Sequence, residues 1–122
     1  MKVLNVVKDI FFGNQNNLIR FRLNNDGSVS KMLISVPNGT LSKYPKLPPM
    51  LVGMGLGISG MDKSERDLMY EKFTNTVLSV SQNGKNSFHE KVSGWCSRNQ
   101  CYIVMDVEFN LSKMDFYFYA YK

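Results

Sequence analysis

The alternation of apolar and polar residues is clearest between Leu18 and Val36. Asp26-Gly27 in its middle is a favoured two-residue hairpin turn. A chain folded there pairs Leu23 with Ser30, Phe21 with Met32 and Ile19 with Ile34. The apolar members of these pairs share one face, and a slip of one residue would scatter them. The pattern therefore predicts an antiparallel hairpin with one buried face.

A second region of period two begins at Phe88 and continues to the end of the chain. Alternate residues from Cys101 to Phe109 are apolar, and after a turn at 110–113 the phenylalanines Phe116 and Phe118 alternate with tyrosines. The segment Val92–Trp95 supplies a strand before them. This spacing is typical of a three-stranded antiparallel meander. We expect the hairpin and the meander to form one continuous sheet.

Helical spacing occurs in two places. From Asp62 to the Asn83-Gly84 stop, a stripe of mainly apolar side chains recurs every three or four residues, and Asp62 stands three residues before Glu65, as in a capping box. This segment predicts a long helix whose stripe packs on one face of the sheet. Val3 to Phe11 also has helical spacing and predicts a short amphipathic N-terminal helix, with a strand as the alternative.

The segment from Pro37 to Gly60 contains all four prolines of the chain. It predicts a long connection, with a short extended piece at Met50–Val52. Gly55–Gly60 spells G-x-G-x-x-G, but a dinucleotide site needs a buried strand before it. The acidic residues that open the following helix would also repel phosphates. We therefore expect no cofactor.

Composition indicates a folded protein of one domain over residues 1–122, because 43% of the residues are hydrophobic and 12% are aromatic. With the patterns above, the fold class is α+β, built on a mainly antiparallel sheet. The net charge of +5 is uneven. Residues 1–50 hold seven basic and two acidic side chains, whereas the remainder is balanced. The excess positive charge therefore belongs to the N-terminal part.

Two cysteines are too few for a disulfide scaffold of this size. Cys96 and Cys101 would lie opposite each other across a hairpin, so a disulfide is geometrically feasible, although a reducing cytosol favours two buried thiols. No apolar run approaches the length that crosses a bilayer. We expect a cytoplasmic protein with no membrane partner. One histidine and one cysteine pair do not indicate a metal site.

Two groups of residues are candidates for binding a partner. The first is basic and consists of Arg20, Arg22, Lys31, Lys43 and Lys46. The second is a set of tyrosines on the outer face of the meander: Tyr102, Tyr117, Tyr119 and Tyr121. Exposed tyrosines are enriched at protein interfaces and also stack bases. The alternatives are a solvated basic edge that prevents aggregation and tyrosines covered by another part of the chain.

No pattern in the sequence carries catalytic chemistry with any specificity. His89 is the only histidine, and its neighbour Glu90 would point to the opposite face of a strand. Asp106 and Glu108 share a strand face, where they would serve as solvent-facing partners of lysines. We therefore expect a protein that is not an enzyme and has no catalytic residues.

The chain is small, has the composition of a single domain and is rich in Asn, Lys and aromatic residues, and it lacks a catalytic constellation. In these respects it resembles the stand-alone immunity proteins of bacteria. The resemblance implies an inhibitor that forms a one-to-one protein–protein complex with a toxin domain and masks it. Immunity proteins against basic nucleases are commonly acidic, so this basic chain would require a partner with an acidic surface. The alternative is a small nucleic-acid-binding protein that uses the basic hairpin and the tyrosine ladder.

Overall fold

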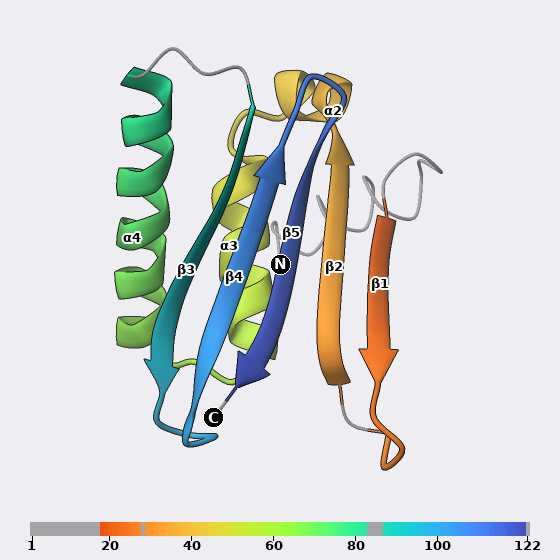
Figure 1. Cartoon of the computed structure of the whole chain (residues 1–122), viewed down its shortest axis with the longest axis vertical. Helices are drawn as coiled ribbons and strands as arrows, with labels where there is room; N and C mark the ends of the chain where they lie inside the picture. Colours follow the sequence, from red (N-terminus) through yellow and green to blue (C-terminus); the bar gives the residue numbers. More distant parts are fainter. Residues whose placement is uncertain (1–17, 28, 83–86, 122) are drawn as a thin grey trace.

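The computed structural model describes residues 18–27, 29–82 and 87–121 (Figure 1). Five strands form one antiparallel sheet in the order β1-β2-β5-β4-β3. The strands are β1 (Leu18–Leu23), β2 (Val29–Pro37), β3 (Phe88–Cys96), β4 (Cys101–Phe109) and β5 (Lys113–Tyr121). The helices are α2 (Asn38–Lys43), α3 (Leu47–Ile58) and α4 (Lys63–Gln82).

The α+β class and the sheet organisation are confirmed. The β1-β2 hairpin and the β3-β4-β5 meander join through the antiparallel pairing of β2 with β5, which makes the sheet continuous. The three described helices all lie between β2 and β3 in the chain, within one long crossover. The predicted N-terminal helix over Val3 to Phe11 lies outside the described residues.

The register of the first hairpin follows the sequence pattern except near its turn. Ile19 pairs with Ile34, and Phe21 pairs with Met32, as predicted. Leu23 pairs with Val29 and not with Ser30, because the register shifts between Arg22 and Leu23. An irregularity of this kind inserts an unpaired residue beside the turn and leaves the alternation further along the strands intact.

The prediction of a long connection between Pro37 and Gly60 is wrong, because this segment forms α2 and α3. Proline is tolerated in the first turn of a helix, where its missing N–H has no intrahelical acceptor, and α3 has proline there. The helix buries Leu47, Leu51 and Leu56 completely. This burial stabilises a helix that its glycines alone would disfavour. The extended piece predicted at Met50–Val52 lies inside α3.

The predicted long helix is confirmed as α4. The side chain of Asp62 accepts a hydrogen bond from the backbone N–H of Glu65 (2.9 Å), and Glu65 accepts one from the N–H of Asp62 (3.0 Å). This reciprocal pair is the capping box that the spacing predicts. Met69, Phe73 and Val80 of the stripe are buried. Among the described helices, none is long and apolar enough to cross a membrane.

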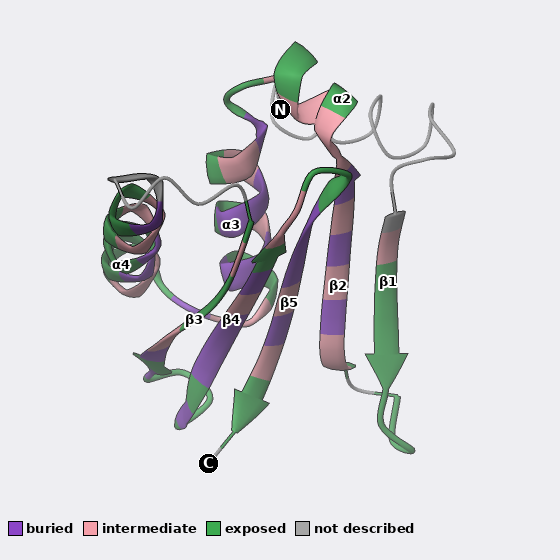
Figure 2. Cartoon of the chain, turned by 45° about the horizontal axis from the view of Figure 1, so that its top comes forward, coloured by how far each residue is buried: buried purple, intermediate pink, exposed green. Residues whose placement is uncertain are grey.

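The helices form one layer behind the sheet, and the hydrophobic core lies between the two layers (Figures 1 and 2). Alternate residues of the central strands face this core, including Ile34 on β2, Met105 on β4 and Phe116 on β5, all fully buried. The side chains between them point to the other side of the sheet. No described helix covers that side (Figure 2), which we call the open face.

Candidate functional site

The open face gathers most of the residues that the sequence singled out. Phe116 and Phe118 face the core, so Tyr117, Tyr119 and Tyr121 point away from it on the same strand. Tyr102 of β4 is the register partner of Tyr121 and lies beside it. On the other flank, the basic side chains of β1 and β2 continue the same rows across the sheet.

One corner of the open face is an exposed aromatic cluster formed by Trp95, Tyr102 and Tyr121. The ring centroids of Tyr102 and Tyr121 are 5.5 Å apart in a stacked arrangement. The Trp95 ring meets Tyr102 edge-on at 5.1 Å. The three residues are nevertheless 44%, 42% and 49% exposed. They therefore form a preorganised apolar surface with two hydroxyl groups at its rim.

The opposite flank of the open face is basic. Arg22 and Lys31 are direct register partners, as the sequence predicts, which places like charges side by side. Lys31 turns toward the neighbouring strand, where its Nζ lies 4.6 Å from the ring centroid of Tyr117 and 5.7 Å from that of Tyr119. A cation over an aromatic ring at this distance is stabilised by about 0.5–1 kcal/mol at an exposed site. The tyrosines thus hold Lys31 in place.

The basic side chains border a shallow hollow of about 470 Å³ on this flank. Its lining combines three cations with apolar and aromatic surface: Arg20, Phe21, Arg22, Lys31, Leu33 and Tyr117. Within the described part of the chain, none of the ion pairs involves Arg20, Arg22 or Lys31. Arg20 and Arg22 are exposed residues on this flank.

Beyond the tyrosines, the open face carries a mixed charge cluster on β3 and β4. His89 Nε2 lies 2.6 Å from Asp106 Oδ1, and Lys91 Nζ lies 4.0 Å from Asp106 Oδ2. Asp106 is the register partner of both Lys91 and Tyr117. Asp106 was expected to be a solvent-facing partner of lysines, but its side chain is only 15% exposed and lies closer to His89 than to Lys91.

Asp115 is the one described charged residue that is buried, with 3% of its surface exposed. Its Oδ2 lies 3.0 Å from Lys113 Nζ. A hydrogen bond and the nearby negative charge of Asp115 raise the pKa of Lys113 above its usual range. Within the described residues, Oδ1 of Asp115 has no hydrogen-bond partner. The lysine is therefore what balances this buried carboxylate.

The structure brings together seven of the nine residues predicted to bind a partner. Lys43 and Lys46 are the exceptions, because they lie in and just after α2, which begins where β2 ends. Lys31 is near the start of β2, and a rise of six steps along the strand separates it from Pro37 by about 20 Å. The basic group is therefore divided between the two ends of β2.

Trp95 belongs to the site but was missed in the sequence. Its neighbours Gly94 and Cys96 are buried, and the alternation of the strand places the indole on the open face. The signal was present in the hairpin itself, because a turn at 97–100 makes Trp95 the partner of Tyr102. Pairing the strands through that turn would have found it.

The described part of the open face offers contact area and charge. In the described ranges, no group of three or more His, Cys, Asp or Glu side chains could hold a metal ion. The chemistry that this surface supports is recognition by packing, hydrogen bonding and charge.

The fold is an α+β domain in which the described helices cover one face of the sheet and none of them covers the open face. Comparison of the chain with protein-family models, with curated proteins and with solved structures finds no match.

Proposed function

We propose that this chain is a non-catalytic protein-binding module that docks its partner on the open face of its sheet. The observation that carries the proposal is the exposed cluster of Trp95, Tyr102 and Tyr121, with Arg22 and Lys31 on the opposite flank of the same face. Trp, Tyr and Arg are the residue types that dominate the binding energy of protein interfaces. Their rings are already ordered by mutual packing, so little conformational entropy is lost on docking.

The charge of the face indicates the chemistry of the partner. Arg20, Arg22 and Lys31 project from one flank and suit a protein with an acidic surface. Together with the resemblance to immunity proteins, this supports an inhibitor that masks a toxin domain in the cytoplasm. The basic flank would then steer the encounter, and the aromatic cluster would provide the contact that slows dissociation.

Nucleic-acid binding is the second candidate, favoured by the hollow in which Arg20, Arg22 and Lys31 surround Tyr117. Phosphates bind arginine and lysine, and single-stranded bases stack on aromatic rings. The packing of the rings favours the protein partner, however. Tyr102 lies against Tyr121 and Trp95, and Lys31 lies over Tyr117, so these rings are engaged with their neighbours.

A purification from the native cell distinguishes the two candidates. We expect the tagged chain to retain a stoichiometric protein partner, identified by mass spectrometry. The double substitution Trp95→Ala with Tyr102→Ala should abolish this retention, because hot-spot residues contribute about 2 kcal/mol or more each. Co-purification of nucleic acid, seen in the ratio of absorbance at 260 and 280 nm, would favour the second candidate.

A matched control is available on α4. Leu68 and Tyr70 are 54% and 39% exposed on the helical side of the molecule. Replacing both by alanine removes a similar apolar area without touching the open face, so the partner should be retained. Equal loss of the partner from both double variants would contradict the proposed docking surface.

A further inference from the structure

Cys96 and Cys101 are the last register pair of the β3-β4 hairpin before its turn. Both thiols are free and buried, with 0% and 4% of each residue exposed. Both lie on the core side, because Trp95 and Tyr102 beside them face the open side. Partner Cα atoms in antiparallel strands are about 4.5–5.5 Å apart, within the range that a disulfide bridges. A bond between the two sulfurs therefore requires no change of register.

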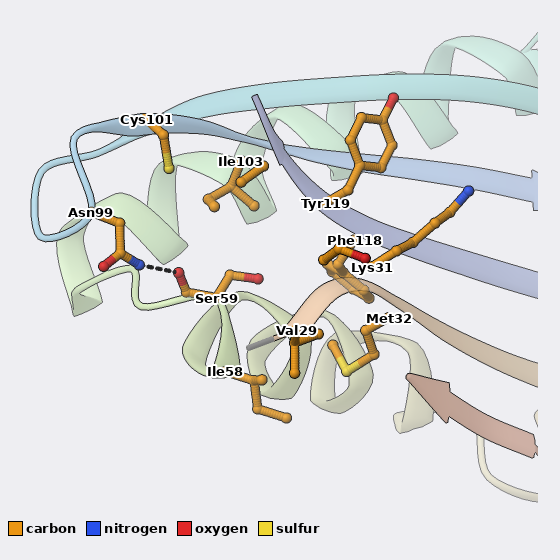
Figure 3. A pocket seen from close by; sticks show the side chains of 12 residues that line it. Val29, Lys31, Met32, Ile58, Ser59, Asn99, Cys101, Ile103, Phe118 and Tyr119 are labelled. Atoms are coloured by element: carbon orange, nitrogen blue, oxygen red, sulfur yellow. Dashed lines mark hydrogen bonds between the residues drawn. The ribbon is translucent and has the colours of Figure 1, made fainter. Parts of the chain in front are cut away.

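The two thiols differ in their access to solvent. Cys101 lines a cavity of about 420 Å³ between the end of α3 and the start of β2, and its sulfur points into this space (Figure 3). Cys96 is not among the lining residues, and its Sγ–H points to the carbonyl oxygen of Ser59 at 3.9 Å. A small reagent that enters the cavity thus meets Cys101 first.

We propose that Cys96 and Cys101 form a reversible cross-strand disulfide by exchange with a low-molecular-weight disulfide that enters this cavity. The thiolate of Cys101 attacks one sulfur of the reagent, which forms a mixed disulfide and releases one thiolate. The thiolate of Cys96 then attacks the Cys101 sulfur and releases the second reagent thiol. The cysteines lose two protons and two electrons, and the reagent disulfide is reduced to two thiols.

Formation of this bond removes one weak hydrogen bond, and the acceptor keeps a second donor. Oxidation removes the thiol donor to the Ser59 carbonyl, but Asn99 Nδ2 also donates to that oxygen at 2.9 Å (Figure 3). The disulfide also fixes the end of the hairpin that carries Trp95 and Tyr102 on the opposite face. In a reducing compartment, a bond of this kind is transient and responds to the redox state.

The order of the two steps can be tested on the folded, full-length chain with hydroxyethyl disulfide as the probe. Intact mass should show that the reduced wild-type protein loses two hydrogen atoms and that both thiols become resistant to alkylation. Cys96→Ser should stop at a mixed disulfide on Cys101. The reaction of Cys101→Ser should be slower by about tenfold or more, because the remaining thiol does not line the cavity.

Two results would overturn the proposal. One is a wild-type protein that keeps two free thiols, or accumulates only mixed disulfides, under these conditions. The other is an equal reaction rate for the two single variants, which indicates exchange through global unfolding. A second measurement does not depend on the fold of the serine variants. The reaction of the wild-type protein with the reagent is quenched early, and peptide mapping locates the mixed disulfide. The mixed disulfide should then be found on Cys101, and finding it on Cys96 refutes the assigned order.

Discussion

Gly55 of α3 lies directly against the ring of Phe118 on β5, so closely that a Cβ at this position would be 2.6 Å from ring atom Cε1. Both residues are buried, and their contact joins the helical layer to the sheet. Phe118 is 2% exposed and belongs to the hydrophobic core, so a Cβ at Gly55 would require its ring or the helix to shift. The glycine therefore sets the distance between α3 and the sheet.

Gly55→Ala should lower the free energy of unfolding by about 1–3 kcal/mol, the usual effect of overpacking a filled core. Gly53→Ala is the matched control, because a Cβ at this exposed position of the same helix meets nothing within 4 Å. Alanine there should raise stability by up to about 1 kcal/mol, since it favours the helix. Urea unfolding measures both changes, and a similar midpoint for the two variants would contradict the packing role of Gly55.

The same contact explains why α3 could not be predicted. Its residues are almost all apolar, so no alternation of faces reveals a helix, and its glycines and Pro48-Pro49 are typical of loops. The helix exists because it is covered on several sides, by the sheet and by α4. These contacts belong to the tertiary structure, so the local sequence pattern does not reveal them. By contrast, the core-facing residues of β1, β2 and β4 recur at every second position, so period two predicted these strands, although Val104 on the other face of β4 is also buried.

The sequence predicted the part of the candidate site whose side chains are placed by the alternation of faces along a strand. Tyr117 and Tyr119 were assigned to the outer face because Phe118 between them had to face the core. The division of the basic residues could not be foreseen, since Lys43 depends on where α2 leaves the sheet. Basic residues that are close in the sequence are therefore separated in space when a helix that was not predicted lies between them.

The capping box of α4 predicts a loss of stability in acid. Hydrogen bonds from backbone N–H groups lower the pKa of Asp62 and that of Glu65, which also accepts one from the Ser97 N–H at 2.8 Å. In the unfolded chain these carboxyls titrate near 3.8 and 4.5. Between about pH 5 and pH 3 the unfolded state therefore binds more protons than the folded state, and acid favours unfolding.

Asp62→Asn combined with Glu65→Gln should weaken this pH dependence, because the amides keep hydrogen-bond acceptors at the cap but do not titrate in this range. The measurement is the free energy of unfolding in urea at several pH values between neutrality and pH 3. Parallel curves for the variant and the wild-type protein would show that other carboxylates account for the acid sensitivity.

The buried carboxylate of Asp115 predicts an asymmetry between two substitutions. Lys113→Met leaves this charge buried without its cation and should lower the free energy of unfolding by about 1–2 kcal/mol. The value is at the modest end because the Lys113 side chain is 51% exposed and solvent weakens the pair. Asp115→Asn should have a smaller effect, since it leaves only an exposed ammonium group unpaired. A larger effect for Asp115→Asn would mean that the carboxylate has another essential partner.

The basic flank of the open face predicts how association with the protein partner depends on salt. Arg20→Glu combined with Arg22→Glu should lower the association rate about tenfold or more at low ionic strength, because the charges steer the encounter. The difference from wild type should shrink as salt rises to about 150 mM, where the screening length is about 8 Å. Lys43→Glu combined with Lys46→Glu changes the net charge equally but lies at the other end of β2. Stopped-flow measurement should find a much weaker effect for this control, and equal effects would assign the steering to net charge alone.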